Sequence, residues 1–291
     1  MTSMAVPSLQ PRKHILIIPE PLTVAAFAPF GTVISPPLSP STTRHPILSG
    51  APLPVPLYTE SQPTITSANQ GTALKASPVS PLLNHYPSKD EAKTHLNTSY
   101  GLMSIFSCFP RLNTYYSKAT ESTPDHRLKL GILERHPFTT QTFCPMSTSQ
   151  PASGTALHYT YILIIVASEI SDPAAHPRNP PDLTRARAFI TPAPLTGQPG
   201  TAVTYAPGTW HAPMIVLGSR RVDFLVTQFA NGCADDDCQE VLIGDGPDEP
   251  ILSRQSRKER REGSASCLVE VDLSSLQLDD NQMPTGRKSK L

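Results

Sequence analysis

The sequence predicts an all-β protein with minor α-helix, and two observations lead to this fold class. Proline accounts for 33 of the 291 residues, roughly twice its usual share of about 5%. Each internal proline removes a helical hydrogen bond and clashes with the preceding turn. From about residue 100 the apolar residues fall in short runs separated by Pro and Gly turns. This pattern is typical of a sandwich or barrel.

The elements begin near the N-terminus. Residues 14–34, HILIIPEPLTVAAFAPFGTVI, are expected to form a short strand, a turn, a short helix and a second strand. Thr23 is a suitable N-cap for that helix, and Gly31 follows the apolar residues as a C-cap would.

The middle and the end of the chain differ from this core in composition. Residues 36–98 are rich in Pro, Ser and Thr, which predicts insertions and irregular, partly mobile loops. We therefore predict one folded domain at 14–245. The polar and charged residues of 246–291 predict a largely disordered tail.

The strands of the core are expected in the second half of the chain, each bounded by turn residues. They are YGLMSIFSC (100–108), RLKLGILERHP (127–137), QTFCPM (141–146), YTYILIIVA (159–167), ARAFIT (186–191), AVTYAPG (202–208) and RVDFLVTQF (221–229).

Composition excludes several classes of function. The formal net charge is zero, so nothing indicates nucleic acid as a partner. No apolar run reaches the ~18–20 residues of a membrane span. No Gly-rich loop precedes a helix, so neither a phosphate-binding loop nor a dinucleotide fingerprint is present, and no organic cofactor is expected. The five cysteines form no CxxC pair and are expected to be reduced.

A first polar cluster lies in LERHPFTTQTFCPM, which holds Glu134, Arg135, His136 and Gln141. In a strand, alternation sends Glu134 and His136 to one face and Arg135 to the other. Burying these polar side chains without hydrogen-bond partners would cost on the order of several kcal/mol. We therefore expect these side chains to line a wet pocket.

The second cluster, YAPGTWHAPMI (205–215), sets Trp210 and His211 after a Pro-Gly turn. Jelly-roll barrels of the cupin type have ligands one residue apart on one strand, a third a few residues on, and a Pro-Gly-x-x-His motif later. Glu134, His136 and Gln141 occupy the first pattern and His211 the second. Glu134, His136 and His211 would suit a divalent ion such as Ni²⁺, Mn²⁺ or Zn²⁺. A metal-free site with a histidine base is the alternative.

The blocks LERHPFTTQTFCPM, DLTRARAFIT, YAPGTWHAP and RVDFLVTQF, with PLTVAAFAPFGTVI near the N-terminus, together closely resemble the ureidoglycolate lyase family. The resemblance implies a cupin-fold homodimer acting late in purine (allantoin) degradation. Its reaction would convert (S)-ureidoglycolate to glyoxylate and urea by base-assisted C–N elimination. One departure is Ser107, which stands in a strand where members of the family carry an arginine.

That reaction needs a cation for the substrate carboxylate, a base and an acid. Arg187 is the expected carboxylate clamp, because guanidinium binds carboxylate bidentately. Arg135 is the second choice, since alternation points it away from Glu134 and His136. His136 or His211 would be the base, and which of them is left open.

The remaining roles are auxiliary. Glu134 would orient a histidine or bind the metal. Gln141 and Trp210 would shape the ureido pocket. Asp223 would orient His211, or it would be a surface aspartate at the end of a strand. Two other functions stay open: another metal-dependent cupin enzyme, such as a dioxygenase or isomerase, and a non-enzymatic cupin that binds small molecules.

The chain ends in Ser289, Lys290 and Leu291. Ser-Lys-Leu at a C-terminus is the tripeptide that the peroxisomal import receptor recognises. We therefore expect a peroxisomal location, with the cytoplasm as the alternative.

Overall fold

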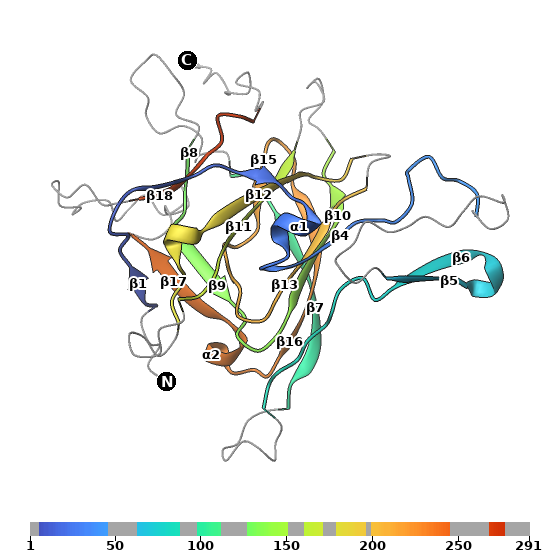
Figure 1. Cartoon of the computed structure of the whole chain (residues 1–291), viewed down its shortest axis with the longest axis horizontal. Helices are drawn as coiled ribbons and strands as arrows, with labels where there is room; N and C mark the ends of the chain where they lie inside the picture. Colours follow the sequence, from blue (N-terminus) through green and yellow to red (C-terminus); the bar gives the residue numbers. More distant parts are fainter. Residues whose placement is uncertain are drawn as a thin grey trace, which may run out of the picture.

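The computed structural model describes residues 6–45, 63–87, 98–111, 127–150, 160–170, 179–195, 199–244 and 268–276. Within these ranges the regular secondary structure consists mainly of β-strands, with two short α-helices (Figure 1), which confirms the predicted fold class. No helix in this part of the chain is long and apolar enough to span a membrane.

The larger of two facing sheets has eight strands, in the order β1-β17-β9-β14-β11-β12-β3, with β15 also paired to β11. Their bounds are β1 Ser8–Leu9, β3 Glu20–Pro21, β9 Ile132–Arg135, β11 Tyr161–Ala167, β12 Arg187–Pro192, β14 Trp210–His211, β15 Ile215–Leu217 and β17 Gln239–Ile243. A 3-10 turn, Leu183–Arg185, leads into β12.

The second sheet has five strands in the order β4-β13-β10-β16-β7. Their bounds are β4 Gly31–Ile34, β7 Tyr100–Cys108, β10 Gln141–Thr148, β13 Ala202–Tyr205 and β16 Val222–Ala230. Aromatic and branched side chains from both sheets, including Phe143, Ile164 and Phe224, form the core between them. The two sheets therefore enclose a cupin-like barrel.

A three-stranded sheet, β2-β18-β8, covers the outer face of the eight-stranded sheet. Its strands are β2 Ile15–Ile17, β8 Arg127–Lys129 and β18 Val269–Asp272. The predicted disordered tail includes residues 269–272, but these residues form a strand between β2 and β8. The reason is alternation: Val269 and Val271 are buried in a second core with Leu133 and Ile165.

The short N-terminal helix α1, Val24–Phe27, begins as predicted, because the Thr23 side chain accepts a hydrogen bond from the Ala26 amide. The C-cap is Ala28, so the prediction for Gly31 was wrong. Gly31 instead opens β4 with φ +148°, and a Cβ there would overlap the carbonyl oxygen of Thr204. Only glycine allows β4 to approach β13 in this way.

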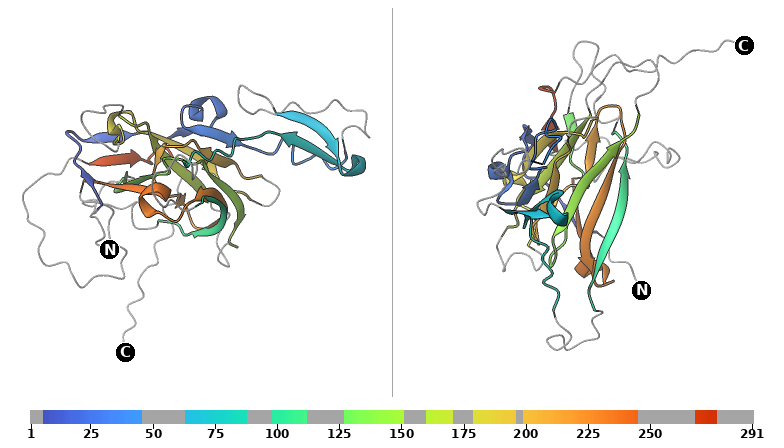
Figure 2. Two further views of the ribbon diagram at one scale, coloured as in Figure 1. Left: turned by 90° about the horizontal axis from the view of Figure 1, so that it is seen from below. Right: turned by 90° about the vertical axis from the view of Figure 1, so that its right-hand side faces the viewer.

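The region 36–98 is more ordered than expected where the structure describes it. Strands β5, Thr64–Ala68, and β6, Ala73–Ser77, form a hairpin through the 3-10 turn Asn69–Gly71. The hairpin projects from the barrel (Figures 1 and 2). Residues 83–86 return to the barrel and lie against the turn between β9 and β10. The second helix, α2 Ala234–Asp237, follows β16.

Candidate active site

The candidate site is built on β9 and β14, which are neighbours in the eight-stranded sheet. Glu134 and His211 stand directly opposite each other across this pair. On the far side His211 pairs with Val166, whose side chain belongs to the inner core, whereas Trp210 pairs with Ala167 of the outer core. Alternation therefore turns Glu134 and His211 into the barrel.

The His211 ring is buried and held on three sides. Its Nδ1 lies 2.9 Å from the Thr209 carbonyl oxygen. Its Nε2 lies 3.2 Å from Gln141 Oε1 and 3.5 Å from Glu134 Oε1. Tyr205 stacks on the ring, with centroids 4.0 Å apart and planes 11° from parallel. Both ring nitrogens therefore face hydrogen-bond acceptors.

His136 follows β9 and lies beside His211, with ring centroids 5.6 Å apart. Its Nδ1 donates to the Asp237 carbonyl oxygen at 2.5 Å, because a carbonyl only accepts. Its Nε2 is buried and has no hydrogen-bond partner among the described residues. Burial, followed by the charge of His211, lowers the pKa of His136 below its ordinary value. The Nε2 lone pair is thus free for a ligand or a proton.

Gln141 begins β10 and lies in a cross-strand row with Tyr205 and Gln228. Its amide nitrogen donates to Gln228 Oε1 at 2.7 Å, which turns its Oε1 toward His211. The five-stranded sheet therefore supplies an amide acceptor to the histidine of the opposite sheet. Gln141 is 4% exposed, so this chain of amides is fixed by burial as well as by hydrogen bonds.

Two further groups complete the polar lining. Burial would raise the pKa of Glu134, but the hydrogen bond and charge of His211, with the charge of His136, outweigh it and lower the pKa. Glu134 is therefore a carboxylate. Burial, with the Glu134 charge, raises the pKa of Tyr205. The Tyr205 hydroxyl has no partner among the described residues.

The residues Glu134, His136 and His211 fit a divalent metal. One ligand atom from each lies within 4.8 Å of the others. Each imidazole is anchored through Nδ1 to a backbone carbonyl, which is how histidine ligands to metals are usually oriented. Two nitrogens and a carboxylate oxygen suit first-row ions such as zinc.

Comparison with known proteins identifies the family. A model of the family described as ureidoglycolate lyase matches residues 14–248. The chain belongs to the ureidoglycolate lyase family. The ureidoglycolate lyase of Saccharomyces cerevisiae is 34% identical over 238 residues, which cover 80% of this chain and 96% of the relative.

Two other relatives carry the same name. The ureidoglycolate lyase of Schizosaccharomyces pombe is 31% identical over 224 residues, 77% of this chain and 89% of the relative. The one from Chelativorans sp. is 28% identical over 212 residues, 72% of this chain and 82% of the relative. The family suggested by the sequence motifs is thereby confirmed.

In this lyase Arg187 stands in the same cross-strand row as Glu134, His211 and Val166, next to Val166 on β12. Its guanidinium forms a bidentate pair with Glu20, with Nε and Nη2 each 2.8 Å from a carboxylate oxygen. Nη1 donates to the Ala26 carbonyl oxygen, and the group lies 4.9 Å from the ring centre of Phe189. Arg187 thus ties β12 to β3 and α1, and its predicted role as carboxylate clamp stays a prediction.

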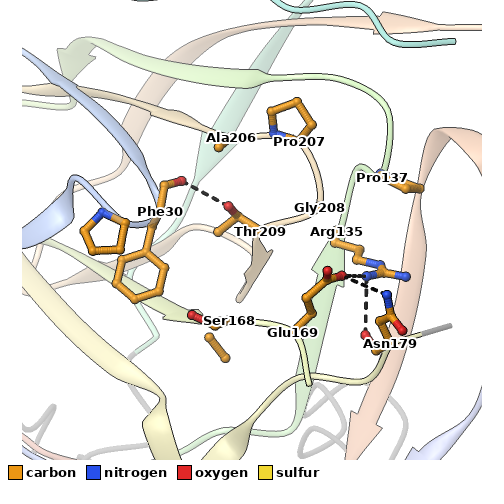
Figure 3. A pocket seen from close by; sticks show the side chains of 12 residues that line it. Phe30, Arg135, Pro137, Ser168, Glu169, Asn179, Ala206, Pro207, Gly208 and Thr209 are labelled. Atoms are coloured by element: carbon orange, nitrogen blue, oxygen red, sulfur yellow. Dashed lines mark hydrogen bonds and ion pairs between the residues drawn. The ribbon is translucent and has the colours of Figure 1, made fainter. Parts of the chain in front are cut away.

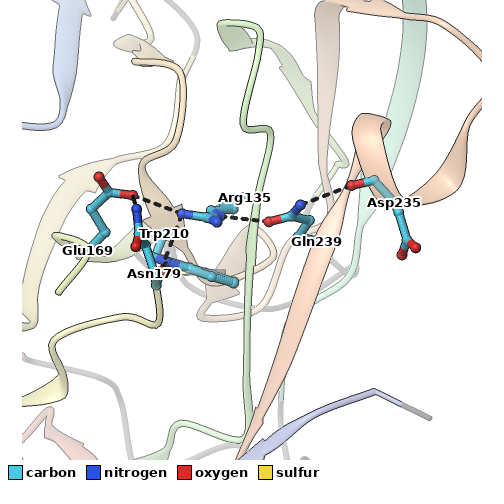
Figure 4. A network of polar contacts seen from close by, with 6 residues as sticks. All are labelled: Arg135, Glu169, Asn179, Trp210, Asp235 and Gln239. Carbon is cyan, nitrogen blue, oxygen red and sulfur yellow. Dashed lines mark hydrogen bonds and ion pairs between the residues drawn. The ribbon is translucent and has the colours of Figure 1, made fainter. Parts of the chain in front are cut away.

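Arg135 and Trp210 lie on the outer face of the sheet, opposite to the face that carries Glu134 and His211, as alternation predicts for Arg135. The Arg135 guanidinium lies 4.7 Å from the ring centre of Trp210. It donates to Gln239 and to Glu169, each at 2.9 Å, while the Trp210 indole donates to the Asn179 carbonyl oxygen (Figure 4). This network joins β9, β14 and β17 behind the site.

Asp223 is likewise separate from His211. Its carboxylate accepts two hydrogen bonds from Arg221 and one from Ser147. It pairs across the strands with Ser107 on β7. The Arg221 hydrogen bonds, followed by that of Ser107, lower the pKa of Asp223 to about 2.

A pocket of about 440 Å³ (Figure 3) is lined in part by Gly208 and Thr209, in the turn that precedes His211. It is lined by Phe30, Arg135, Glu169, Asn179 and the turn 206–209, and not by Glu134, His136 or His211. Its one lining cation, Arg135, is already paired with Glu169. The Thr209 carbonyl oxygen of this turn contacts His211. We take Glu134, His136 and His211 as the candidate site because their titratable side chains converge, although they do not line the pocket.

Three residues that lie close to the site were not predicted from the sequence: Tyr205, Asp237 and Cys238. The Cys238 thiol lies within 4.8 Å of Glu134 and Glu240 carboxylate oxygens. Burial, followed by the charge of Glu134, raises the pKa of Cys238 to about 12, so it remains a thiol. Tyr205 could have been found from alternation, since it precedes the Pro-Gly turn on an inward-facing strand. Asp237 acts through its backbone, which leaves no sequence signal.

Proposed function

We propose that this chain cleaves (S)-ureidoglycolate to glyoxylate and urea, in the degradation of purines through allantoin. The observation that carries the proposal is the convergence of Glu134, His136 and His211 at one end of the barrel of a family member. The relatives that match it are named ureidoglycolate lyases. The substrate carbon bears a hydroxyl, a carboxylate and the ureido nitrogen, so elimination needs only proton transfers.

His136 suits the role of general base. Its Nε2 has no partner among the described residues and its lowered pKa favours the neutral ring. It would take the proton from the substrate hydroxyl as the C–O bond becomes the aldehyde carbonyl of glyoxylate. The electron pair released from that oxygen expels the ureido nitrogen, so the C–N bond breaks without a covalent intermediate.

His211 suits the role of general acid. Its Nδ1 faces the Thr209 carbonyl oxygen and its Nε2 faces Gln141 Oε1 and Glu134 Oε1, so both nitrogens are placed to donate a proton. It would give its Nε2 proton to the departing ureido nitrogen and so release urea. The Glu134 carboxylate would stabilise the charged ring before the transfer, as a carboxylate does beside a catalytic imidazole. Transfer of the hydroxyl proton from His136 to His211 would restore both rings and complete the cycle.

The metal-bound site is the second candidate, favoured by the anchored Nδ1 atoms of His136 and His211. Glu134, His136 and His211 would hold a divalent Ni, Mn or Zn ion. Such an ion would polarise the substrate hydroxyl and lower its pKa. Chelation followed by elemental analysis and assay separates the two candidates. Full activity of a metal-free sample would decide for proton transfer by the histidines alone.

The test of function is urea and glyoxylate release from racemic ureidoglycolate. We expect His136→Ala and His211→Ala each to lower kcat by about a hundredfold or more, the scale of lost acid–base catalysis. Thr160→Val removes a buried hydroxyl in the described structure away from the site and serves as the control. Near wild-type activity of both folded histidine variants would reject the site.

We also propose a homodimer joined through β7. This strand is the edge of the five-stranded sheet (Figure 2) and exposes Met103 at 67% and Ile105 at 59%. A long, exposed apolar edge is a site of pairing with another chain. Light scattering should give twice the monomer mass, and the double variant Met103→Lys/Ile105→Lys should give the monomer mass. A monomeric wild type would reject the dimer.

For location we propose the peroxisome, supported by the terminal Ser289-Lys290-Leu291, which lies outside the described residues. A fluorescent protein fused to the N-terminus should label peroxisomes, and deletion of the three residues should return it to the cytosol. Identical cytosolic signal from both fusions would decide for the cytoplasm.

A further inference from the structure

Residues 83–86, at the end of the described insertion, are bound to the turn that follows His136. The Leu83 amide donates to Thr140 Oγ1 at 3.0 Å, and the Thr140 amide donates back to the Leu83 carbonyl oxygen at 3.2 Å. The His85 amide donates to the Phe138 carbonyl oxygen at 2.8 Å. Two backbone–backbone hydrogen bonds and one to a side chain, in so short a segment, fix its register against the turn between β9 and β10.

Tyr86 ends this segment and reaches past the turn. Its ring packs on Phe138, with centroids 5.4 Å apart. Its hydroxyl donates to Asp237 Oδ1 at 2.6 Å. Burial, followed by the hydrogen bond to Asp237, raises the pKa of Tyr86, so the phenol keeps its proton and remains a donor.

Asp237 is the residue through which this contact reaches the site. Its carboxylate also accepts from the amides of Asn231, at 2.7 Å, and Gly232, at 2.8 Å. These three donors hold Asp237 at the end of α2. Its own backbone carbonyl then accepts the hydrogen bond from His136 Nδ1. The side chain of Asp237 thus fixes its position while its carbonyl fixes the histidine.

We propose that Tyr86 and Asp237 are positioning residues for His136, and that residues 83–86 are part of the active-site architecture. The proposal rests on the proposed function of His136 as a base. Without the Tyr86 hydroxyl, the Asp237 carbonyl is less constrained. The hydrogen bond that favours the Nδ1–H tautomer of His136 is then weaker. The lone pair on His136 Nε2 therefore faces the substrate in a smaller fraction of molecules.

The test is Tyr86→Phe, which keeps the ring on Phe138 and removes only the hydroxyl. We expect kcat for urea release to fall about tenfold, because small misplacements of a catalytic group cost up to about a hundredfold, with KM changing less than twofold. Thr160→Val, the control used above for the histidine variants, should change neither. Unchanged kcat in folded Tyr86→Phe would overturn the proposal.

A double-mutant cycle separates positioning from general loosening of the fold. If Tyr86 acts through His136, Tyr86→Phe should have no further effect on kcat in the His136→Ala background. A full tenfold loss in that background would show that Tyr86 does not act through His136. If Tyr86→Phe proves too unstable to assay, Phe138→Leu loosens the same ring without touching Asp237 and should give the same non-additivity.

A readout free of activity keeps this proposal distinct from the proposed function. Nitrogen-15 NMR of the histidine rings, assigned with His136→Ala, should report the Nδ1–H tautomer for His136 in the wild type. It should report a mixture of tautomers in Tyr86→Phe. If the wild type releases no urea, the proposed function fails, yet this spectrum still tests the positioning. An unchanged tautomer in Tyr86→Phe would overturn it.

Discussion

Tyr205→Phe offers a sharp test of how the site is packed. The Tyr205 side chain is 2% exposed, and its hydroxyl has no partner among the described residues. A buried, unsatisfied polar group costs about 1–3 kcal/mol. The substitution keeps the stack on His211 and the edge contact with Phe143, with centroids 4.0 and 6.1 Å away. We therefore expect unfolding free energy to rise by about 1 kcal/mol, near the lower bound for such a group.

The measurement is thermal unfolding by calorimetry without ligand, where a gain of 1 kcal/mol raises Tm by about 2–4 °C in a domain of this size. Tyr86→Phe is the comparison variant, and we expect its Tm to change in the opposite direction. Its hydroxyl is bonded to the Asp237 carboxylate, and a hydrogen bond to a charged group contributes about 1.5–3 kcal/mol, so Tm should fall. A fall in Tm for Tyr205→Phe would mean that its hydroxyl has a partner, and this account of the site's interior would be wrong.

Three further outcomes are expected. Gly31→Ala should lower unfolding free energy in urea by about 3 kcal/mol or more, because φ +148° and the Thr204 carbonyl leave no room for a Cβ; a change below about 1 kcal/mol would contradict this. Asp223→Asn should destabilise the protein at neutral pH, where the wild-type carboxylate contributes through its lowered pKa. The difference should disappear as pH falls toward about 2, and a difference that grew in acid would contradict the sign. The acid limb of kcat/KM should lie below the ordinary histidine pKa of about 6.5, because burial lowers the pKa of His136; a limb above that value would exclude neutral His136 as the base.

Strand positions and the inward faces of the motif residues could be predicted from the sequence. Strands are set by local patterns of apolar residues and turns, and β7 and β16 follow the runs YGLMSIFSC and RVDFLVTQF closely. Alternation also separates Glu134 and His136 from Arg135. The pairing of Glu134 with His211 could not be predicted from these local patterns, because the register between distant strands depends on the whole barrel. Only the motif spacing indicated it.

The partners of the charged residues could not be predicted. Arg187 and Glu20 are far apart in the sequence and meet only because β12 and β3 pair. The docking of Tyr86 on Asp237 was also invisible, because a Pro- and Ser-rich composition predicts loops without saying where they attach. Strand β18 was missed since its few apolar residues stand alone between polar stretches, and its burial depends on β2 and β8.

The central claim is that this barrel eliminates urea from ureidoglycolate with His136 and His211 as its proton-transfer groups. The most direct measurement follows glyoxylate, urea and ammonia together during turnover of (S)-ureidoglycolate by the wild type and by His136→Ala. The account predicts one urea for each glyoxylate, no ammonia, and a rate about a hundredfold lower in the folded variant. Ammonia in place of urea, or an undiminished rate in His136→Ala, would contradict it.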